Sequence, residues 1–292
     1  MTTALASQRE LDRILFAGTC TAVGQFRCAV RDPRFPDSGP TQNAIVVFPR
    51  TSVWIRHARS PAFVADANVI TIYNRGQEYG RRAVSPEGDR CEWFAMTDDV
   101  AIEAACAFDP SAADRPRRPF TFERAVSPPD LYFRQRALVR RLRRGLVDPL
   151  AVEDEALAII SLAIRQAYGR RPAPLSTRRA AARRRADLAE AARAELQRAP
   201  NVNRSVGELA ASLSASPFHL CRVFHAVTGR TLHYYRTELR LRAALERFEG
   251  ETANTTLSAI AHDLGFASHA HFSTAMRRVL GVAPSLLREA LR

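Results

Sequence analysis

The sequence predicts an α+β protein, with a β-barrel and packing helices in its N-terminal part and an all-helical C-terminal domain. Residues 19–123 contain short β-branched and aromatic runs separated by Pro, Gly, Asn and Asp, which is typical of a small barrel or sandwich. Residues 130–168 change to a helical period. The last part of the chain, from residue 188, repeats one helix-turn-helix pattern, which predicts two such units joined by a long helix.

The strand prediction for the first part depends on runs that suit a pleated, half-buried surface. These runs are residues 44–48, 52–55 and 69–73. Turn-forming residues separate the runs, at positions 37–40, 74–76 and 86–89.

Residues 130–168 are expected to form two amphipathic helices with a break at Asp148-Pro149. Their apolar positions are Leu131, Ala137, Leu138, Leu142 and Leu146 in the first helix, and Val152, Ala156, Ile159, Ile160, Ala163 and Ile164 in the second. Packing on the barrel and packing on a second subunit would both bury these faces, and the sequence leaves that choice open. Residues 170–187 are expected to be an arginine-rich linker, whose arginines either contact phosphates or form a solvated helix face.

The repeat in the C-terminal domain consists of a short helix, a tight turn, a second helix with a serine N-cap, and a closing glycine. The matching residues are Leu209–Leu213, Ser216 and Gly229 in the first copy, and Ile260–Leu264, Ser268 and Gly281 in the second. The copies are offset by 51 residues before the turn (209 to 260) and by 52 after it (216 to 268), so the second turn is one residue longer.

Between the copies, residues 231–248 are expected to form one long helix that fixes the spacing of the two units. Two helix-turn-helix units held at a fixed spacing can place their second helices in adjacent major grooves on one face of DNA. The alternative is a helical bundle without a role in DNA binding. Two matched helix-turn-helix units argue against this alternative more strongly than one unit would.

Specific motifs in this domain carry a family resemblance. They are residues 205–210, 216–224, 228–229, 260–261, 264–266, 271–273, 277–278 and 281–285. With these motifs, residues 205–292 resemble the AraC/XylS family of transcription regulators. The resemblance implies a cupin-like N-terminal barrel that binds an effector, followed by helices used for dimerisation. The expected domains are a sensing barrel at 1–127, a dimerisation or packing segment at 128–169, a linker at 170–187 and the double helix-turn-helix domain at 188–292.

The family reads bases from the exposed face of each recognition helix. By position, this implies Phe218, Cys221 and Arg222 in the first unit, and His269, Ala270, His271 and Thr274 in the second. Arg222 is the leading candidate, because a bidentate arginine–guanine pair gives about 1–3 kcal/mol of discrimination. A phosphate contact is the alternative for Arg222.

The second unit departs from the family pattern, which often has arginine at the position of Thr274 and phenylalanine at that of Met276. Threonine cannot form the two parallel hydrogen bonds that arginine makes with guanine, so the first unit is expected to carry more of the base specificity. Arg277 and Arg278 are expected to hold phosphates. His271 matches a position that often packs within the fold, so packing and DNA contact both stay open for it.

The barrel offers a candidate effector pocket with aromatic walls and a few polar groups. Its candidate residues are Trp54, Arg56, Tyr73, Gln77, Tyr79 and Trp93, each of which can instead be an ordinary core or surface residue. Arg81 and Arg82 suggest an anionic effector. His57 is the only histidine before residue 131, so the metal-binding cupin signature is missing, and neither a metal nor another cofactor is expected.

The five cysteines are odd in number and their spacings match no zinc pattern. Most are expected to be small buried hydrophobes. A thiol switch is the alternative, because Cys20 and Cys28 are close in sequence and Arg90 could lower the pKa of Cys91.

Composition adds a weaker argument for a nucleic-acid partner. The net charge is +13, and all 43 basic residues are arginine. Because arginine and alanine both have GC-rich codons, a GC-rich genome explains part of this bias. The polar first residues, up to Leu11, and the lack of an apolar run of 18 or more lead us to expect a cytoplasmic protein without a membrane span.

The expected function is a sequence-specific DNA-binding transcription regulator, controlled by an effector and activating by recruitment of RNA polymerase. The expected partners are double-stranded DNA, RNA polymerase, a small-molecule effector and a second copy of the chain. An enzyme, either a cupin catalyst or a DNA-repair fusion, is disfavoured by the missing His-x-His and by the lack of a nucleophile motif. A nonspecific architectural DNA binder is the third class, which competition between DNA sequences distinguishes.

Overall fold

A computed structural model describes residues 11–37, 39–58, 60–145, 148–169, 179–250 and 255–291. The chain divides into two compact units, Met1–Arg171 and Pro172–Arg292. This division lies at the start of the segment predicted as a linker. Helix α5 (Arg179–Arg198) begins inside that segment, which agrees with the helical alternative for its arginines. The alanines of residues 180–182 are good helix formers and favour a helix here.

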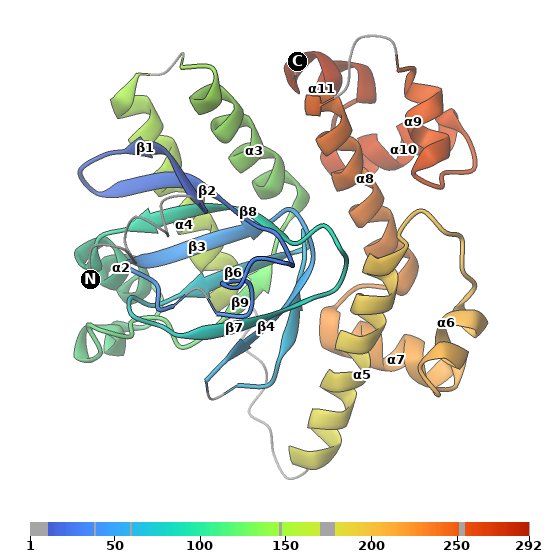
Figure 1. The fold of residues 1–292 in the computed structure, drawn as a ribbon, viewed down its shortest axis with the longest axis horizontal. Helices are drawn as coiled ribbons and strands as arrows, with labels where there is room; N and C mark the ends of the chain where they lie inside the picture. The colour runs from blue at the N-terminus through green and yellow to red at the C-terminus, as the bar shows by residue number, and fades with distance from the viewer. Residues whose placement is uncertain are drawn as a thin grey trace. The chain divides into compact units, whose positions relative to one another are not determined.

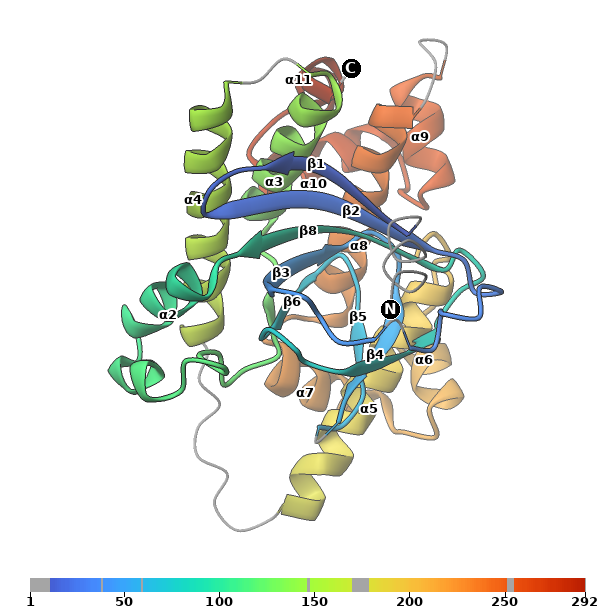
Figure 2. The same cartoon turned by 60° about the vertical axis from the view of Figure 1, so that its left-hand side comes forward.

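The first unit consists of two antiparallel sheets (Figures 1 and 2). The six-stranded sheet has the order β1-β2-β8-β3-β6-β9. Its strands are β1 (Asp12–Ala17), β2 (Thr21–Cys28), β8 (Asp89–Met96), β3 (Ala44–Pro49), β6 (Val69–Tyr73) and β9 (Arg124–Val126). The three-stranded sheet has the order β5-β4-β7, with strands β5 (Phe63–Ala65), β4 (Val53–His57) and β7 (Tyr79–Ala83).

A shared apolar core joins the inner faces of the two sheets. Phe26, Val47 and Tyr73 enter it from the larger sheet, and Ile55 and Phe63 from the smaller one. No strand pairing within the described residues connects the two sheets, so the predicted antiparallel sheets are confirmed and their closure into a barrel is not shown. The pattern of alternating strands is the same in a closed barrel and in a two-sheet sandwich, so it could not separate them.

Two elements were missed by the strand-like reading of residues 19–123. Strand β1 begins before this range, at Asp12, and helix α2 (Asp98–Cys106) lies within it. A short 3-10 helix (Pro110–Asp114) follows α2. The alanine-rich segment of α2 could have indicated a helix, since alanine favours helix over strand.

The helices α3 (Pro129–Arg143) and α4 (Pro149–Tyr168) follow the sheets, with the predicted break at Asp148, whose side chain caps α4. Their apolar stripes are buried within a single chain, with Ile159 and Ile160 fully inaccessible to solvent. Except for the half-buried Ala137, the described positions of both stripes are thus buried within one chain, and dimerisation through these helices stays a prediction. Leu146 lies outside the described residues.

A buried charge cluster links α3 to the larger sheet. Glu92 of β8 is fully buried and accepts hydrogen bonds from Arg50 at 2.5 Å and from Gln25 at 3.1 Å. Arg136 of α3 places its Nη1 3.7 Å from the same carboxylate oxygen. Because a buried carboxylate is costly without such partners, these contacts fix α3 on the sheet.

The described part of the second unit contains helices and no strands, and α8 (Leu232–Gly250) runs between two groups of helices (Figure 1). The other helices are α5, α6 (Val206–Ser212), α7 (Pro217–Thr228), α9 (Leu257–Asp263), α10 (His269–Leu280) and α11 (Pro284–Leu291). The first helix-turn-helix unit, α6–α7, packs on α5 and α8 around Leu209, Leu220 and Phe224. The second unit, α9–α10, packs with α11 on α8.

The predicted internal repeat is confirmed in its details. Helix α9 begins 51 residues after α6, and α10 begins 52 residues after α7. The caps also match, because Ser216 and Ser268 each accept a backbone N–H, and Gly229 and Gly281 have left-handed φ values of 70° and 74°. The backbone N–H of Ala215 donates to the carbonyl oxygen of Ala210, and the N–H of Phe266 donates to that of Ala261, so Ala215 and Phe266 are equivalent. Ala267, between Phe266 and the N-cap Ser268, is therefore the extra residue of the second turn.

Candidate functional site

Helix α7 separates its side chains into a buried and an exposed face. Leu220, Val223 and Phe224 are buried against the neighbouring helices. Cys221 and Arg222, two of the predicted DNA contacts, are exposed on the other face. The side chain of Phe218, the third predicted contact in this unit, lies outside the described part of the structure.

Helix α10 has the same division. Phe272 and Met276 are fully buried, so methionine fills the core at the position where the family often has phenylalanine. All six predicted contacts of this unit are exposed: His269, Ala270, His271, Thr274, Arg277 and Arg278. The structure therefore places the predicted residues whose side chains it describes on one solvent-facing surface of each helix.

His271 is both packed against the fold and exposed, so its contact with DNA stays a prediction. Its side chain is exposed, and its ring makes an edge-on contact with Phe266 at a centroid distance of 5.5 Å. The backbone N–H of His271 also donates to the N-cap Ser268. One face of the ring therefore packs on the turn, and the rest stays accessible to a ligand.

The prediction omitted exposed residues beside the named ones. These residues are His219 and His225 of α7. Arg183, Arg184 and Arg185 of the predicted linker are exposed on α5, which agrees with both alternatives given for them. The helical period could have identified the two histidines, because both lie within one turn of Arg222.

Arg240 of α8 connects the loop before the first unit to the turn of the second. Its guanidinium donates to the carbonyl oxygens of Pro200 at 2.6 Å and Gly265 at 2.7 Å, and to Asn203 Oδ1 at 2.9 Å. Asn203 donates in turn to the Gly265 carbonyl oxygen at 3.3 Å. Burial, aided by the charge of Arg236, lowers the pKa of Arg240 to about 10, and the acceptors compensate for that burial. The arrangement holds the two units in one register.

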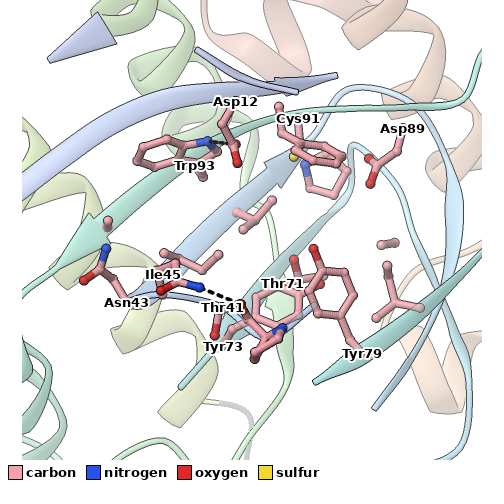
Figure 3. Close-up of a pocket in the computed structure, with 18 of the residues that line it drawn as sticks. Asp12, Thr41, Asn43, Ile45, Thr71, Tyr73, Tyr79, Asp89, Cys91 and Trp93 are labelled. Atoms are coloured by element: carbon pink, nitrogen blue, oxygen red, sulfur yellow. Dashed lines mark hydrogen bonds between the residues drawn. The ribbon is translucent and has the colours of Figure 1, made fainter. Parts of the chain in front are cut away.

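A cavity of about 350 Å³ lies between the two sheets of the first unit (Figure 3). Three of the six predicted pocket residues line it: Tyr73, Tyr79 and Trp93. Other lining residues are apolar side chains of both sheets, a loop at residues 39–43, and the carboxylates of Asp12 and Asp89. This volume is in the range of small-molecule sites, which span about 300–1,000 Å³.

The other three predicted pocket residues lie elsewhere. In β4, Val53 and Ile55 face the cavity, so Trp54 and Arg56 point away from it, because strand side chains alternate. Gln77 hydrogen-bonds with His57 Nδ1 beside a second, polar depression. The sequence could not reveal which set of alternate residues faces inward, because both sets contain aromatic residues.

Arg81, which suggested an anionic effector, is already occupied. It donates to Asp89 at 2.8 Å, to the Phe35 carbonyl oxygen at 3.0 Å and to the Arg34 carbonyl oxygen at 3.2 Å. Its guanidinium also lies over the Phe26 ring at 4.6 Å. Arg82 is exposed and does not line the cavity. Neither arginine therefore offers a free positive charge to a ligand in the cavity.

Asp12 is a lining residue that the sequence reading missed. Its carboxylate accepts a hydrogen bond from the Trp93 indole at 2.9 Å (Figure 3). The indole can reach across the intervening strand because that strand has Gly24 at this point, where a Cβ would lie 2.2 Å from the Trp93 ring. Burial raises the pKa of Asp12 to about 6, against smaller opposing effects of Trp93 and Arg81.

Two of the cysteines that suggested a thiol switch, Cys28 and Cys91, are buried and disfavoured as thiolates. Burial raises the pKa of Cys91 well above its ordinary value, and it also raises the pKa of Cys28. Arg90 cannot counteract this effect on Cys91, because adjacent strand residues point to opposite faces. The one exposed cysteine among the described residues is Cys221 on α7.

Within the described ranges, no three His, Cys, Asp or Glu side chains come close enough together to hold a metal ion. No helix in those ranges combines the length and apolarity needed to cross a membrane.

Comparison with known proteins identifies the C-terminal domain. A family model described as a helix-turn-helix domain matches residues 209–290. An AraC-like transcription regulator from Streptomyces lividans is 33% identical over 94 residues, which cover 32% of this chain and 30% of that protein. The match thus spans less than a third of the relative's length.

Solved structures give more distant matches. ToxT from Vibrio cholerae O395 is 13% identical with a TM-score of 0.35, over 93% of this chain and 97% of that chain. The DNA-binding domain of AdpA, solved in complex with a target DNA, is 27% identical with a TM-score of 0.33, over 36% of this chain and 92% of that chain. The two sequence matches are to a transcription regulator and to a helix-turn-helix domain. By these sequence matches, residues 209–290 form a helix-turn-helix domain, and the C-terminal part of the chain is similar to that of an AraC-like transcription regulator.

Proposed function

We propose that this protein is a sequence-specific transcription regulator whose two helix-turn-helix units read adjacent major-groove segments under the control of a small molecule. The observation that carries this proposal is the repeated division of α7 and α10. Each helix buries its apolar face and exposes hydrogen-bonding side chains. A recognition helix needs this arrangement to enter the major groove while staying attached to its domain.

In this proposal the exposed residues have different tasks. Arg222 forms the bidentate contact with guanine, and Cys221 and Phe218 contact neighbouring base edges. Thr274 makes a single polar or methyl contact, so the second unit contributes less specificity. Arg277 and Arg278, in the last turn of α10, hold phosphates.

The two-sheet domain serves as the cupin-like sensor, with its cavity as the effector site. The route from this cavity to α3 is short, because adjacent residues of β8 face opposite sides of the sheet. Cys91 and Trp93 line the cavity, and Glu92 between them contacts Arg136 of α3. A ligand that shifts β8 therefore changes the position of α3.

Homodimerisation and activation through RNA polymerase complete the proposal, both as the family implies. The apolar stripes of α3 and α4 are already buried within one chain, so a dimer would use the outer faces of these helices, where Leu150 is 70% exposed. A native mass spectrum of the full chain measures the assembly directly and also detects a co-purified effector.

The test of DNA reading is a competition experiment with Arg222→Ala. Arg165→Ala removes the same charge from the exposed end of α4 and serves as the control. We expect Arg222→Ala to lose about 1–3 kcal/mol at one base pair and to relax the preference there. A uniform loss across all sequences would make Arg222 a phosphate contact, and an unchanged affinity would remove it from the interface.

A further inference from the structure

We propose that the cavity between the sheets selects an apolar organic cation, such as an arylalkyl amine, with Asp12 as its counter-ion. This inference rests on the proposed function, since it names the chemical class of ligand for the proposed effector site. It also replaces the anionic effector that Arg81 and Arg82 suggested in the sequence.

The charges around the cavity are the first observation that favours a cationic ligand. Its described lining residues include two carboxylates, Asp12 and Asp89, and none of them is arginine or histidine. Asp89 is neutralised by Arg81, whose Nη1 lies 2.8 Å away. The cavity therefore has one uncompensated charge, and it is negative.

The surroundings of Asp12 are the second observation that favours a cationic ligand. Its side chain accepts a hydrogen bond from the Trp93 indole, and no described ion pair neutralises it. Burial raises its pKa to about 6, so the carboxylate is ionised at neutral pH at a cost in solvation. An ammonium group beside Asp12 would recover that cost through a charge-assisted hydrogen bond.

The walls of the cavity suit the rest of such a ligand. Trp93 lies beside Asp12, and the rings of Tyr73 and Tyr79 lie across the open space from them (Figure 3). Aromatic faces attract cations, more strongly when water is excluded. The remaining surface is mostly apolar, with Ile45 and Val47 among its residues, and it would cover an aryl or alkyl body.

A carboxylate ligand meets the opposite situation. It would bring a second negative charge close to Asp12, and the guanidinium of Arg81, whose charge acts on Asp12, already donates to Asp89 and to two backbone carbonyl oxygens. Like charges at short range disfavour ionisation, so an acid would enter only by taking up a proton.

The experiment compares three probes with one skeleton: 4-phenylbutylamine, 4-phenylbutan-1-ol and 4-phenylbutyrate. Calorimetric titration of the full chain at pH 7.5 gives an affinity for each. We expect the amine to bind about tenfold tighter than the alcohol, which corresponds to one charge-assisted contact, and the carboxylate to bind weakest. In Asp12→Asn, the amine should fall to the affinity of the alcohol, while the alcohol is unchanged. Asp99→Asn, an exposed carboxylate on α2, is the matched control.

A second measurement uses the unmodified protein, so it does not depend on the folding of a variant. Lowering the pH from 7.5 to 5 should weaken amine binding and leave alcohol binding unchanged, because Asp12 takes up a proton. Equal or tighter binding of the carboxylate, or an amine affinity that is insensitive to Asp12→Asn, would overturn the choice of ligand class while the cavity stays a ligand site. Failure of all three probes to bind would overturn the cavity as an effector site as well.

Discussion

Arg240 donates a hydrogen bond to the carbonyl oxygen of Gly265 at 2.7 Å, and this contact fixes the turn of the second helix-turn-helix unit on the long helix α8. The same guanidinium holds the loop that leads into the first unit, through Pro200 and Asn203. Two recognition helices that enter adjacent major grooves need a fixed spacing, because adjacent grooves on one face of DNA are one helical turn apart. In the proposed function, Arg240 would therefore support DNA reading through the spacing of the two units and not through a contact with DNA.

The conformation of Gly265 gives the first prediction. Its φ is +79°, and a Cβ at this position would lie 2.0 Å from the carbonyl oxygen of Asn201. Gly265→Ala should lower the free energy of unfolding by about 2–4 kcal/mol, from left-handed strain and the displaced loop. Thermal unfolding measures the loss. Gly207→Ala on α6 is the control, since its nearest atom would be 3.8 Å away, and it should be neutral or slightly stabilising. Equal stability of the two variants would contradict this assignment.

The second prediction concerns the Arg240 side chain. Arg240→Lys keeps the charge, but an ammonium group cannot reach the three acceptors that the planar guanidinium bridges. We expect a loss of about 1–3 kcal/mol in stability, together with a larger loss of affinity for DNA with both half-sites than for DNA with the first half-site alone. Titration of both DNAs with the purified variant measures this difference. Equal losses on both DNAs would show that Arg240 does not couple the units.

The pKa of Asp12 gives a prediction about stability and pH. The folded pKa is raised from 3.8 to about 6, so this group contributes stability below pH 3.8 and loses it as the pH rises through 6. Asp12→Asn removes this dependence. Without ligand, the free energy of unfolding of the variant relative to the wild type should increase from pH 5 to pH 8, by an amount on the order of 1–3 kcal/mol. Urea unfolding at both pH values gives the difference, and a constant difference would refute the raised pKa.

The exposure of Cys221 allows a direct footprint of the interface. It is the exposed cysteine of the described chain, and it lies beside Arg222 on α7. Specific DNA should slow alkylation of Cys221 by N-ethylmaleimide about tenfold or more, which mass spectrometry of peptides detects; this factor equals about 1.4 kcal/mol of protection. Cys106, half-buried on α2 in the first unit, is the internal control and should react at the same rate with and without DNA. Unchanged reactivity of Cys221 would place α7 outside the groove.

The C-terminal domain was predictable from sequence in much greater detail than the N-terminal one. Serine caps, closing glycines and an apolar period are local signals, and Ser216, Ser268, Gly229 and Gly281 all have the predicted roles. Even the one-residue difference between the turns was visible, and the structure adds that Ala267 is the extra residue.

The cavity depends on non-local relationships that a sequence does not display. Asp12 and Trp93 are 81 residues apart and meet only because Gly24, on the strand between them, leaves room for the indole. The inward orientation of Tyr73 and the outward orientation of Trp54 follow from strand register, which depends on pairing partners. For the same reason, Arg81 could not be recognised as the partner of Asp89.

Selection of bound sequences from a random DNA pool by the purified full chain tests the central claim most directly. The account predicts one enriched motif with two segments about 10 base pairs apart, the better-defined segment losing one base preference in Arg222→Ala. Recovery of DNA without sequence enrichment, at an affinity that depends only on salt, would contradict the account and make the protein a nonspecific DNA binder.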